Sequence, residues 1–161
     1  MNLTLAHIGA RSGARSSQPT KSKPKSGSGL DDLTQLYLAR CSPFAHCQSE
    51  AFRAEEDLLA WLSRQQGRMP AVAVLLDSRG KQMTSEVFAA WLGARRDEGA
   101  QHIVFAIGPP DGWSETARGR AQLLLSLGPM TLAHALARLV MAEQIYRAFT
   151  ILTGHPYHAG H

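Results

Sequence analysis

The order of apolar and polar residues along the chain predicts short strands that alternate with helices. The stretch LTLAHIG, from Leu3 to Gly9, alternates apolar and polar positions and then meets a glycine, which is typical of a strand followed by a turn. Two continuous apolar runs, AVAVLLD at 71–77 and HIVFAIG at 102–108, predict buried strands that lead into loops. The short stretch MTL at 130–132 is a candidate third strand of this kind.

Three segments in the first two thirds of the chain have helical spacing. In 30–41, apolar residues recur at helical intervals and two aspartates suit the first turn. The segment 50–67 also has this spacing and closes at Gly67, a favoured residue after a helix. The segment 84–99 opens with a Ser/Thr cap and stops at a glycine.

The C-terminal third predicts the longest helix, over 131–152. Thr131 stands at its cap position, and one predicted apolar face consists of Leu132, Leu136, Leu139 and Val140. The preceding segment, 114–128, fits either a helix or a partly irregular stretch.

Strands alternating with helices define an α/β fold, with a mostly parallel sheet flanked by helices. Ligands in such folds bind at the C-terminal ends of the strands. Here these ends are Leu76–Asp77, Ile107–Gly108 and the segment 128–133. We therefore expect one pocket where these three segments meet.

Composition supports a soluble globular protein. The chain has 161 residues, of which 44% are hydrophobic and 19% charged, which suits a single domain spanning 1–161. No apolar run approaches the roughly 20 residues that cross a bilayer. The N-terminal sequence also lacks the basic and apolar regions of a signal peptide. We expect a cytoplasmic protein with no membrane partner.

The excess positive charge is concentrated near the N-terminus. Lysine and arginine number 17 against 13 acidic residues, and five of these cations precede the first acidic residue, Asp31. They lie in a Ser-, Gly- and Pro-rich segment at about 11–29, which predicts a flexible basic loop. Two interpretations remain open: a solvated linker, or an arm that contacts RNA phosphates.

Histidines and cysteines form two groups that suggest a metal site. The C-terminal tail contains His155, His158 and His161, while Cys41 and Cys47 flank another histidine. The paired spacings of structural zinc sites are absent, so we predict no metal. In a cytosolic chain, the two thiols are expected to be unpaired.

The remaining motifs are weak one at a time. FAIGPPDG at 105–112 is neither G-x-G-x-x-G nor a P-loop, which disfavours a nicotinamide or ATP enzyme, and its spacing suits an ordinary strand-to-helix turn. No G-x-S-x-G nucleophile elbow occurs. Glu143 and Arg147 have the spacing of a surface ion pair, and His134 suits a solvated helix start.

Taken together, three stretches resemble one family. They are LDSRGKQMTSEVFAAWL at 76–92, FAIGPPDGWS at 105–114 and MTLAHALARLVMAEQIYRAFTILTGHPYH at 130–158. They resemble the ribosomal large subunit methyltransferase H family, the pseudouridine-specific branch of the SPOUT methyltransferases. The resemblance is strongest over 72–158 and weaker over 30–67.

The resemblance implies a fold and a reaction that the residue pattern alone does not indicate. It implies an α/β domain with a deep C-terminal trefoil knot, S-adenosylmethionine bound within the knot, and a homodimer. The implied reaction is methylation of N3 of pseudouridine 1915, in helix 69 of 23S rRNA, on the assembled ribosome.

The resemblance also assigns site residues. The implied cofactor-binding positions are Leu76, Gly108, Gly128, Pro129, Met130, Thr131, Leu132 and Ala133. The implied catalytic positions are His134, Arg147, Tyr157 and His158. Within this set, a neutral His158 is our first candidate for the base that deprotonates N3, with Tyr157 orienting the target.

Two departures from the family pattern affect this site. Pro109 stands where relatives have a second glycine, which removes one backbone N–H. Ala159 stands where relatives have an arginine, and the basic loop at 11–29 could compensate for that arginine. Two rival interpretations remain: a SPOUT-like methyltransferase acting on another RNA, and a non-catalytic ribosome-binding factor.

Overall fold

The computed structural model describes residues 1–9, 28–65 and 69–158. The strands are β1 (Asn2–Ile8), β2 (His46–Phe52), β3 (Val72–Gln82), β4 (His102–Ile107) and β5 (Leu123–Ser126). The helices are α1 (Ser28–Arg40), α2 (Glu55–Arg64), α3 (Ser85–Asp97), α4 (Glu115–Arg120) and α5 (His134–Leu152). The predicted basic loop lies outside the described residues except at its end, where α1 begins, and Gly67 and Ala159 also lie outside them.

The five strands form one parallel sheet in the order β2-β1-β4-β3-β5. This confirms the predicted α/β class with a parallel sheet. The register pairs Leu76, in the middle of β3, with Ile107 at the end of β4 and with Leu125 near the end of β5. The irregular part of β3 that starts after Leu76 and the loops that follow β4 and β5 therefore meet at one edge of the sheet, where the sequence predicted a pocket.

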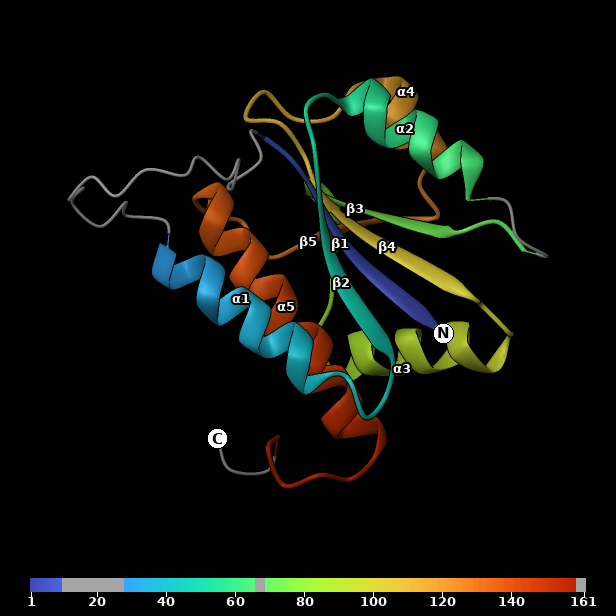
Figure 1. Ribbon diagram of the computed structural model, residues 1–161, viewed down its shortest axis with the longest axis vertical. Coiled ribbons are helices and arrows are strands. Elements are labelled where there is room, and N and C mark those ends of the chain that lie inside the picture. Colours follow the sequence, from blue (N-terminus) through green and yellow to red (C-terminus); the bar gives the residue numbers. More distant parts are fainter. Residues whose placement is uncertain (10–27, 66–68, 159–161) are drawn as a thin grey trace, which may run out of the picture.

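Helices cover both faces of the sheet, as Figure 1 shows. On one face α1, α3 and α5 pack together, and Leu92, Phe105 and Met141 are fully buried in the larger core. On the other face α2 and α4 enclose a smaller core that includes Leu58 and Ala117. Burying one such large side chain contributes about 2 kcal/mol, so both layers stabilise the sheet.

Four of the predicted elements are wrong in detail. The strand predicted at 71–77 is β3, which continues past an irregularity to Gln82. Residues 50–52, predicted as the start of a helix, form the end of β2, and the helix itself begins at Glu55. The last strand is β5 at 123–126 and not 130–132, which belong to the following loop. The cap position of α5 is Ala133 and not Thr131.

The strand β3 contains an irregularity beside β5. Its pairing with β5 shifts between Leu76 and Lys81, so residues 77–80 leave the regular ladder. A Cβ at Gly80 would lie 2.6 Å from the main-chain carbon of Leu124. Glycine is therefore required for the close approach of the two backbones here.

None of the described helices is long and apolar enough to cross a bilayer.

Candidate functional site

A cavity of about 630 Å³ lies between residues 76–79 of β3 and the loops that follow β4 and β5. This volume is typical of small-molecule sites. Its wall combines apolar side chains with loop backbone, and it continues to the first residues of α5, where His134 and Ala137 line it. The cavity lies where ligands bind in parallel α/β folds.

Most of the predicted cofactor positions meet in this cavity. Its lining includes Leu76, Gly108, Gly128, Met130, Thr131 and Leu132. Pro129 and Ala133 belong to the same loop but are not lining residues. The structure therefore brings three segments, distant in sequence, around one space.

Trp113 fixes the loop after β4 against the end of β3. Its indole Nε1 donates a hydrogen bond to the Leu76 carbonyl at 2.9 Å, and the side chain is buried. A Cβ at Gly108 would lie 2.7 Å from Cε2 of this ring. The absence of a side chain at Gly108 therefore leaves room for the Trp113 ring.

The loop between Gly108 and Trp113 contains a tight turn. The Gly112 N–H donates to the Pro109 carbonyl at 2.9 Å, and Gly112 has a φ of 83°. Pro109 lines the cavity, and its missing N–H leaves the carbonyl as its main-chain hydrogen-bonding group. That carbonyl closes the turn.

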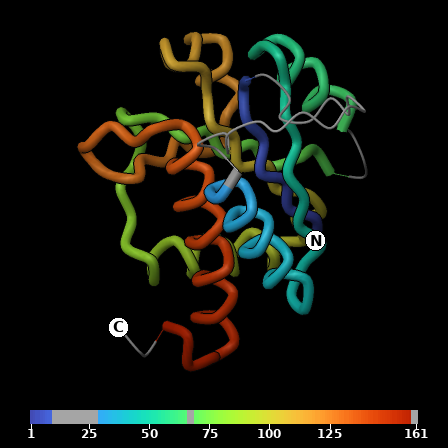
Figure 2. The backbone as a smooth tube through the Cα atoms, turned by 60° about the vertical axis from the view of Figure 1, so that its left-hand side comes forward, coloured from blue at the N-terminus to red at the C-terminus, as the bar shows by residue number. Residues whose placement is uncertain are grey.

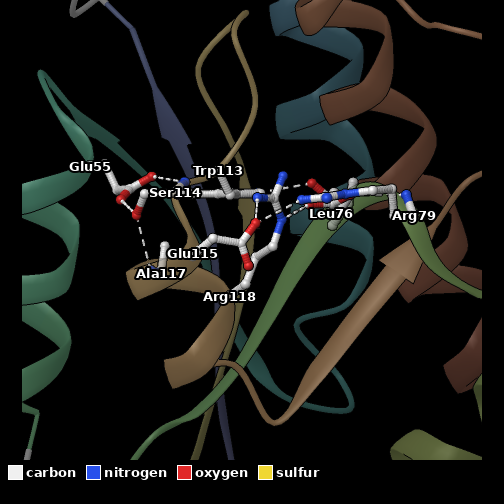
Figure 3. A network of polar contacts seen from close by, with 9 residues as sticks. Glu55, Leu76, Arg79, Trp113, Ser114, Glu115, Ala117 and Arg118 are labelled. Atoms are coloured by element: carbon white, nitrogen blue, oxygen red, sulfur yellow. Dashed lines mark hydrogen bonds and ion pairs between the residues drawn. The ribbon is translucent and has the colours of Figure 1, made fainter.

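An ionic network braces the same wall (Figure 3). Asp77 is buried and accepts hydrogen bonds from the Arg79 N–H at 2.9 Å and from Arg118 Nε at 2.7 Å. Burial acts to raise the pKa of Asp77, but these hydrogen bonds and the arginine charges outweigh it, so the pKa lies below its ordinary value. Glu115 pairs with both arginines, and Glu55 of α2 accepts from Ser114. The network ties α2 and α4 to the end of β3.

The start of α5 adjoins a cluster of basic side chains. The His7 and His134 rings lie 5.7 Å apart, and Arg138 pairs with Asp31 of α1 at 2.9 Å. Burial, followed by the charges of Arg138 and His134, lowers the pKa of His7 to about 4. Burial and Arg138 also lower the pKa of His134. Both rings are therefore neutral at pH 7.

The predicted residues of the tail form a second cluster, at the C-terminal end of α5. Glu143 accepts hydrogen bonds from Arg147 Nε at 2.9 Å and from the Tyr157 hydroxyl at 3.0 Å, and it forms an ion pair with Arg147. The Tyr157 hydroxyl also lies 3.4 Å from that of Tyr37 in α1. Burial, with contributions from Tyr37 and Glu143, raises the pKa of Tyr157, which stays a hydrogen-bond donor. The Glu143–Arg147 pair is thus part of a half-buried network.

His158 bridges this cluster to α3. Its Nε2 lies 3.0 Å from a carboxylate oxygen of Glu86, and its Nδ1 lies 3.5 Å from Arg147 Nη1. A carboxylate accepts and a guanidinium donates, so this environment favours the tautomer with the proton on Nε2. Nδ1 is then the acceptor, and its contact with Arg147 is long.

Within one chain, the cavity and the tail cluster are apart. His134 and Arg147 belong to the same helix and are separated by 13 residues, which corresponds to about 20 Å of helix rise. Figure 2 shows the loop after β5 and the tail at opposite ends of α5. Of the four predicted catalytic residues, the structure places His134 at the cavity and Arg147, Tyr157 and His158 in the other cluster.

Several residues of the site were not expected from the sequence. They are Trp113 and Arg118, which line the cavity, and His7 and Arg138, which lie near His134. Asp77 was expected at the pocket as part of a predicted strand end. The others come close to the cavity or to His134 only through the packing of distant segments.

Metal ligands do not gather in the part of the chain that the structure describes, where no group of three or more His, Cys, Asp or Glu side chains could hold an ion. Cys41 and Cys47 are free thiols, as expected. A hydrogen bond with Cys47, followed by burial, raises the pKa of Cys41, so its thiol is protonated.

The fold and the cavity define a parallel α/β protein with a small-molecule site at its C-terminal edge. A family model described as a predicted SPOUT methyltransferase matches residues 22–158. The chain therefore belongs to the SPOUT methyltransferase family, which confirms the resemblance seen in the sequence.

Two relatives and one solved structure illustrate the similarity. Ribosomal RNA large subunit methyltransferase H of Koribacter versatilis (strain Ellin345) is 49% identical over 134 residues, covering 83% of this chain and 91% of that protein. The protein of that name from Brucella ovis is 53% identical over 88 residues, covering 55% of this chain and 52% of its own length. The SpoU methyltransferase AviRb from Streptomyces viridochromogenes has a TM-score of 0.51 at 12% identity, over 95% of this chain and 61% of that chain. The chain thus spans about half of the Brucella relative and three fifths of AviRb, whose likeness is one of fold.

Proposed function

We propose that this protein is an rRNA methyltransferase of the large ribosomal subunit, active in the cytoplasm. In this proposal it transfers a methyl group from S-adenosylmethionine to N3 of pseudouridine 1915 in helix 69 of 23S rRNA, on the assembled ribosome. The observation that carries the proposal is the convergence of the resemblance-derived cofactor positions in one cavity of about 630 Å³. The names of the two methyltransferase H relatives support the choice of substrate.

The cavity fits the proposed cofactor. Leu76, Leu132 and Ala137 supply apolar wall for an adenosyl group, and the loop at 127–132 supplies backbone groups for its polar edges. When bound, S-adenosylmethionine supplies an electrophilic methyl group, whose transfer leaves S-adenosylhomocysteine. The protein must therefore orient the target base and remove its N3 proton, because in-line displacement depends on positioning.

The tail cluster supplies groups for both tasks. Glu86 accepts a hydrogen bond from the Nε2–H of His158, which leaves Nδ1 of the neutral ring without a proton. In this proposal, Nδ1 therefore accepts the proton from N3 of the target base. Glu86 then stabilises the imidazolium that forms. Tyr157 donates to Glu143 and presents its ring under Arg147, whose guanidinium carbon lies 5.0 Å from the ring centroid. These two residues form a rigid platform for the incoming base.

A homodimer would unite the two clusters. Because about 20 Å of α5 separates them within one chain, we propose that the tail of a second copy reaches the cavity of the first. Exposed apolar side chains near the cavity and on α3 and α5 support such a contact: Val87 is 46% exposed, Met130 78% and Leu136 37%. The resemblance also implies that the C-terminal part of each copy is knotted.

The function is tested by methyl transfer from tritiated S-adenosylmethionine. Assembled ribosomes, naked 23S rRNA and tRNA serve as substrates, and mass spectrometry locates the product. We expect incorporation into ribosomes at one pseudouridine. Incorporation into tRNA alone would show that the enzyme acts on another RNA, and binding to ribosomes without any incorporation would show a non-catalytic factor.

The shared site is tested by mixing two inactive variants. His158→Ala removes the proposed base, and Leu132→Trp fills the cavity. After random exchange of subunits, half of the dimers carry one of each and retain one intact site, so we expect about a quarter of wild-type activity. If the mixture stays inactive while sedimentation shows exchanged dimers, each site is built from one chain.

A further inference from the structure

All three tyrosines of the chain form one cluster beside the tail. The ring centroids of Tyr37 in α1 and Tyr146 in α5 lie 6.1 Å apart, and the Tyr157 ring meets that of Tyr146 edge-on at 4.9 Å. All three residues are half-buried. Because α1 packs along α5, as Figure 1 shows, the C-terminal end of α1 adjoins the surface that carries the tail residues.

Arg40 packs on this tyrosine cluster. Its guanidinium carbon lies 5.3 Å from the centroid of the Tyr37 ring and 5.9 Å from that of the Tyr146 ring. Arg40 is exposed and stands in the last turn of α1. A planar guanidinium that packs on aromatic rings is held in place, while the N–H groups at its edges stay available.

The charge of Arg40 is not neutralised within the described part of the chain. There, its guanidinium makes the two ring contacts but no hydrogen bond or ion pair, whereas Arg147 pairs with Glu143. The N–H donors of Arg40 therefore remain for a ligand outside the chain. A phosphate is the anion that suits them, because it accepts two parallel hydrogen bonds from one guanidinium.

We propose that Arg40 binds a backbone phosphate of the rRNA strand that carries the target base. This inference rests on the proposed function, in which Tyr157 and His158 receive that base. The base and the phosphates beside it belong to one strand, and the Tyr37 hydroxyl under Arg40 lies 3.4 Å from the Tyr157 hydroxyl. The proposal gives α1 a role in substrate binding that the resemblance does not assign.

The test measures how the affinity for ribosomes depends on salt. A cation that binds a phosphate displaces a counterion, so each such contact steepens the fall of log K with log salt concentration by about 0.7–0.9. The Kd for assembled ribosomes is measured at several KCl concentrations and constant Mg²⁺. We expect Arg40→Gln to weaken binding about tenfold at low salt and to reduce the slope by about that amount. An unchanged Kd and slope in this variant would overturn the proposal.

Two further variants of Arg40 separate its charge from its packing. Arg40→Lys should keep the slope, because the charge stays, but bind less tightly, because an ammonium lacks the paired donors. A slope as low as that of Arg40→Gln would contradict a phosphate contact. Arg40→Met, whose flexible side chain still packs on the rings, should lose affinity and slope as Arg40→Gln does. This variant decides if Arg40→Gln does not fold.

Arg64 provides a matched control. It is also exposed, stands in the last turn of α2 and has no acidic partner among the described residues, but α2 lies on the opposite face of the sheet from α1. Both arginines therefore interact alike with the dipole of their helix. We expect Arg64→Gln to keep the wild-type affinity and slope. If both Gln variants lower the slope equally, the effect is one of net charge and the proposal fails.

The remaining outcomes separate this inference from the proposed function. A wild-type protein that neither binds nor methylates ribosomes contradicts the function. A wild-type protein that methylates ribosomes, with Arg40→Gln and Arg64→Gln indistinguishable in affinity and slope, contradicts only the role of Arg40. A lower kcat in Arg40→Gln at an unchanged slope would show that Arg40 only supports the tyrosine cluster, which also overturns the proposal.

Discussion

Replacing Gly108 with alanine tests how the cavity wall is held together. The added methyl carbon would lie 2.7 Å from Cε2 and 2.9 Å from Nε1 of the Trp113 ring, closer than carbon and ring atoms pack. The ring must move by several tenths of an ångström or more, and its hydrogen bond to the Leu76 carbonyl lengthens from 2.9 Å. Because the ring is buried between α4 and the sheet, neighbouring atoms resist this movement.

The expected cost follows from these contacts. Overpacking of a core typically costs 1–3 kcal/mol, and weakening the hydrogen bond adds about 1 kcal/mol. Alanine also reduces the conformational entropy of the unfolded chain, which stabilises the folded protein by about 0.4–1 kcal/mol. We therefore expect Gly108→Ala to lower the free energy of unfolding by about 2–3 kcal/mol. It should also weaken binding of S-adenosylmethionine, since both residues line the cavity.

Urea denaturation followed by circular dichroism measures this effect, and the chain offers a matched control. A Cβ at Gly119, in α4, would meet nothing within 4 Å, so Gly119→Ala should be neutral or stabilising by up to about 1 kcal/mol. Gly108→Ala should also cost much less in a Trp113→Leu background, where the ring is absent. If it costs the same in both backgrounds, or no more than Gly119→Ala, the proposed clash is wrong.

Three further predictions address the sheet, the buried histidine and the proposed base. Gly80→Ala should destabilise by about 3 kcal/mol in urea denaturation, because its Cβ would meet main-chain atoms of β5 that cannot rotate away. In the folded protein the pKa of His7 is lowered to about 4, whereas in the unfolded chain it is about 6.5. As the pH falls through this range, His7 becomes protonated in the unfolded chain before it does so in the folded protein. The folded protein therefore loses about 3 kcal/mol of stability between pH 6.5 and pH 4. His7→Phe should remove that part of the pH dependence. His158→Ala should lower kcat at saturating ribosomes by about 100-fold or more, and Glu86→Gln by a smaller factor.

Each of these has an outcome that contradicts it. If the Gly80→Ala variant is as stable as Gly119→Ala, the inferred close approach of β3 and β5 is wrong. An identical pH dependence in His7→Phe and wild type would show that the His7 pKa is not shifted. A kcat near wild type in His158→Ala would exclude the general-base role.

Central strands were more predictable from the sequence than edge strands. The strand β4 and the first part of β3 lie inside the sheet and are mostly buried, so they appear as continuous apolar runs. The edge strand β2 is mostly half-buried and carries polar residues, which resemble the start of the helix that follows. The other edge strand, β5, has only four residues and adjoins a short helix. Both were missed because an edge strand needs less apolar surface.

The orientation of α5 was also not predictable from periodicity. Its apolar residues occur almost all around the helix, so several faces match a helical period. The buried positions include Ala137, Met141 and Ala148, whereas Leu136 of the predicted face is 37% exposed. The choice of face depends on where α1 and α3 pack, as Figure 1 shows, and this information lies in distant segments.

The helix α5 also explains why the predicted cofactor positions in loops were easier to place than the residues predicted to be catalytic. Loops after parallel strands meet at one edge wherever the registers agree, so Leu76 and Gly108 were expected at one pocket from strand order alone. Residues along one straight helix are separated by its rise, and 13 residues put His134 and Arg147 about 20 Å apart however the chain folds elsewhere. A site that uses both ends of α5 therefore requires a second α5, which no pattern within one sequence specifies. The proposal of a site shared between two copies therefore rests on the separation of His134 and Arg147 along α5.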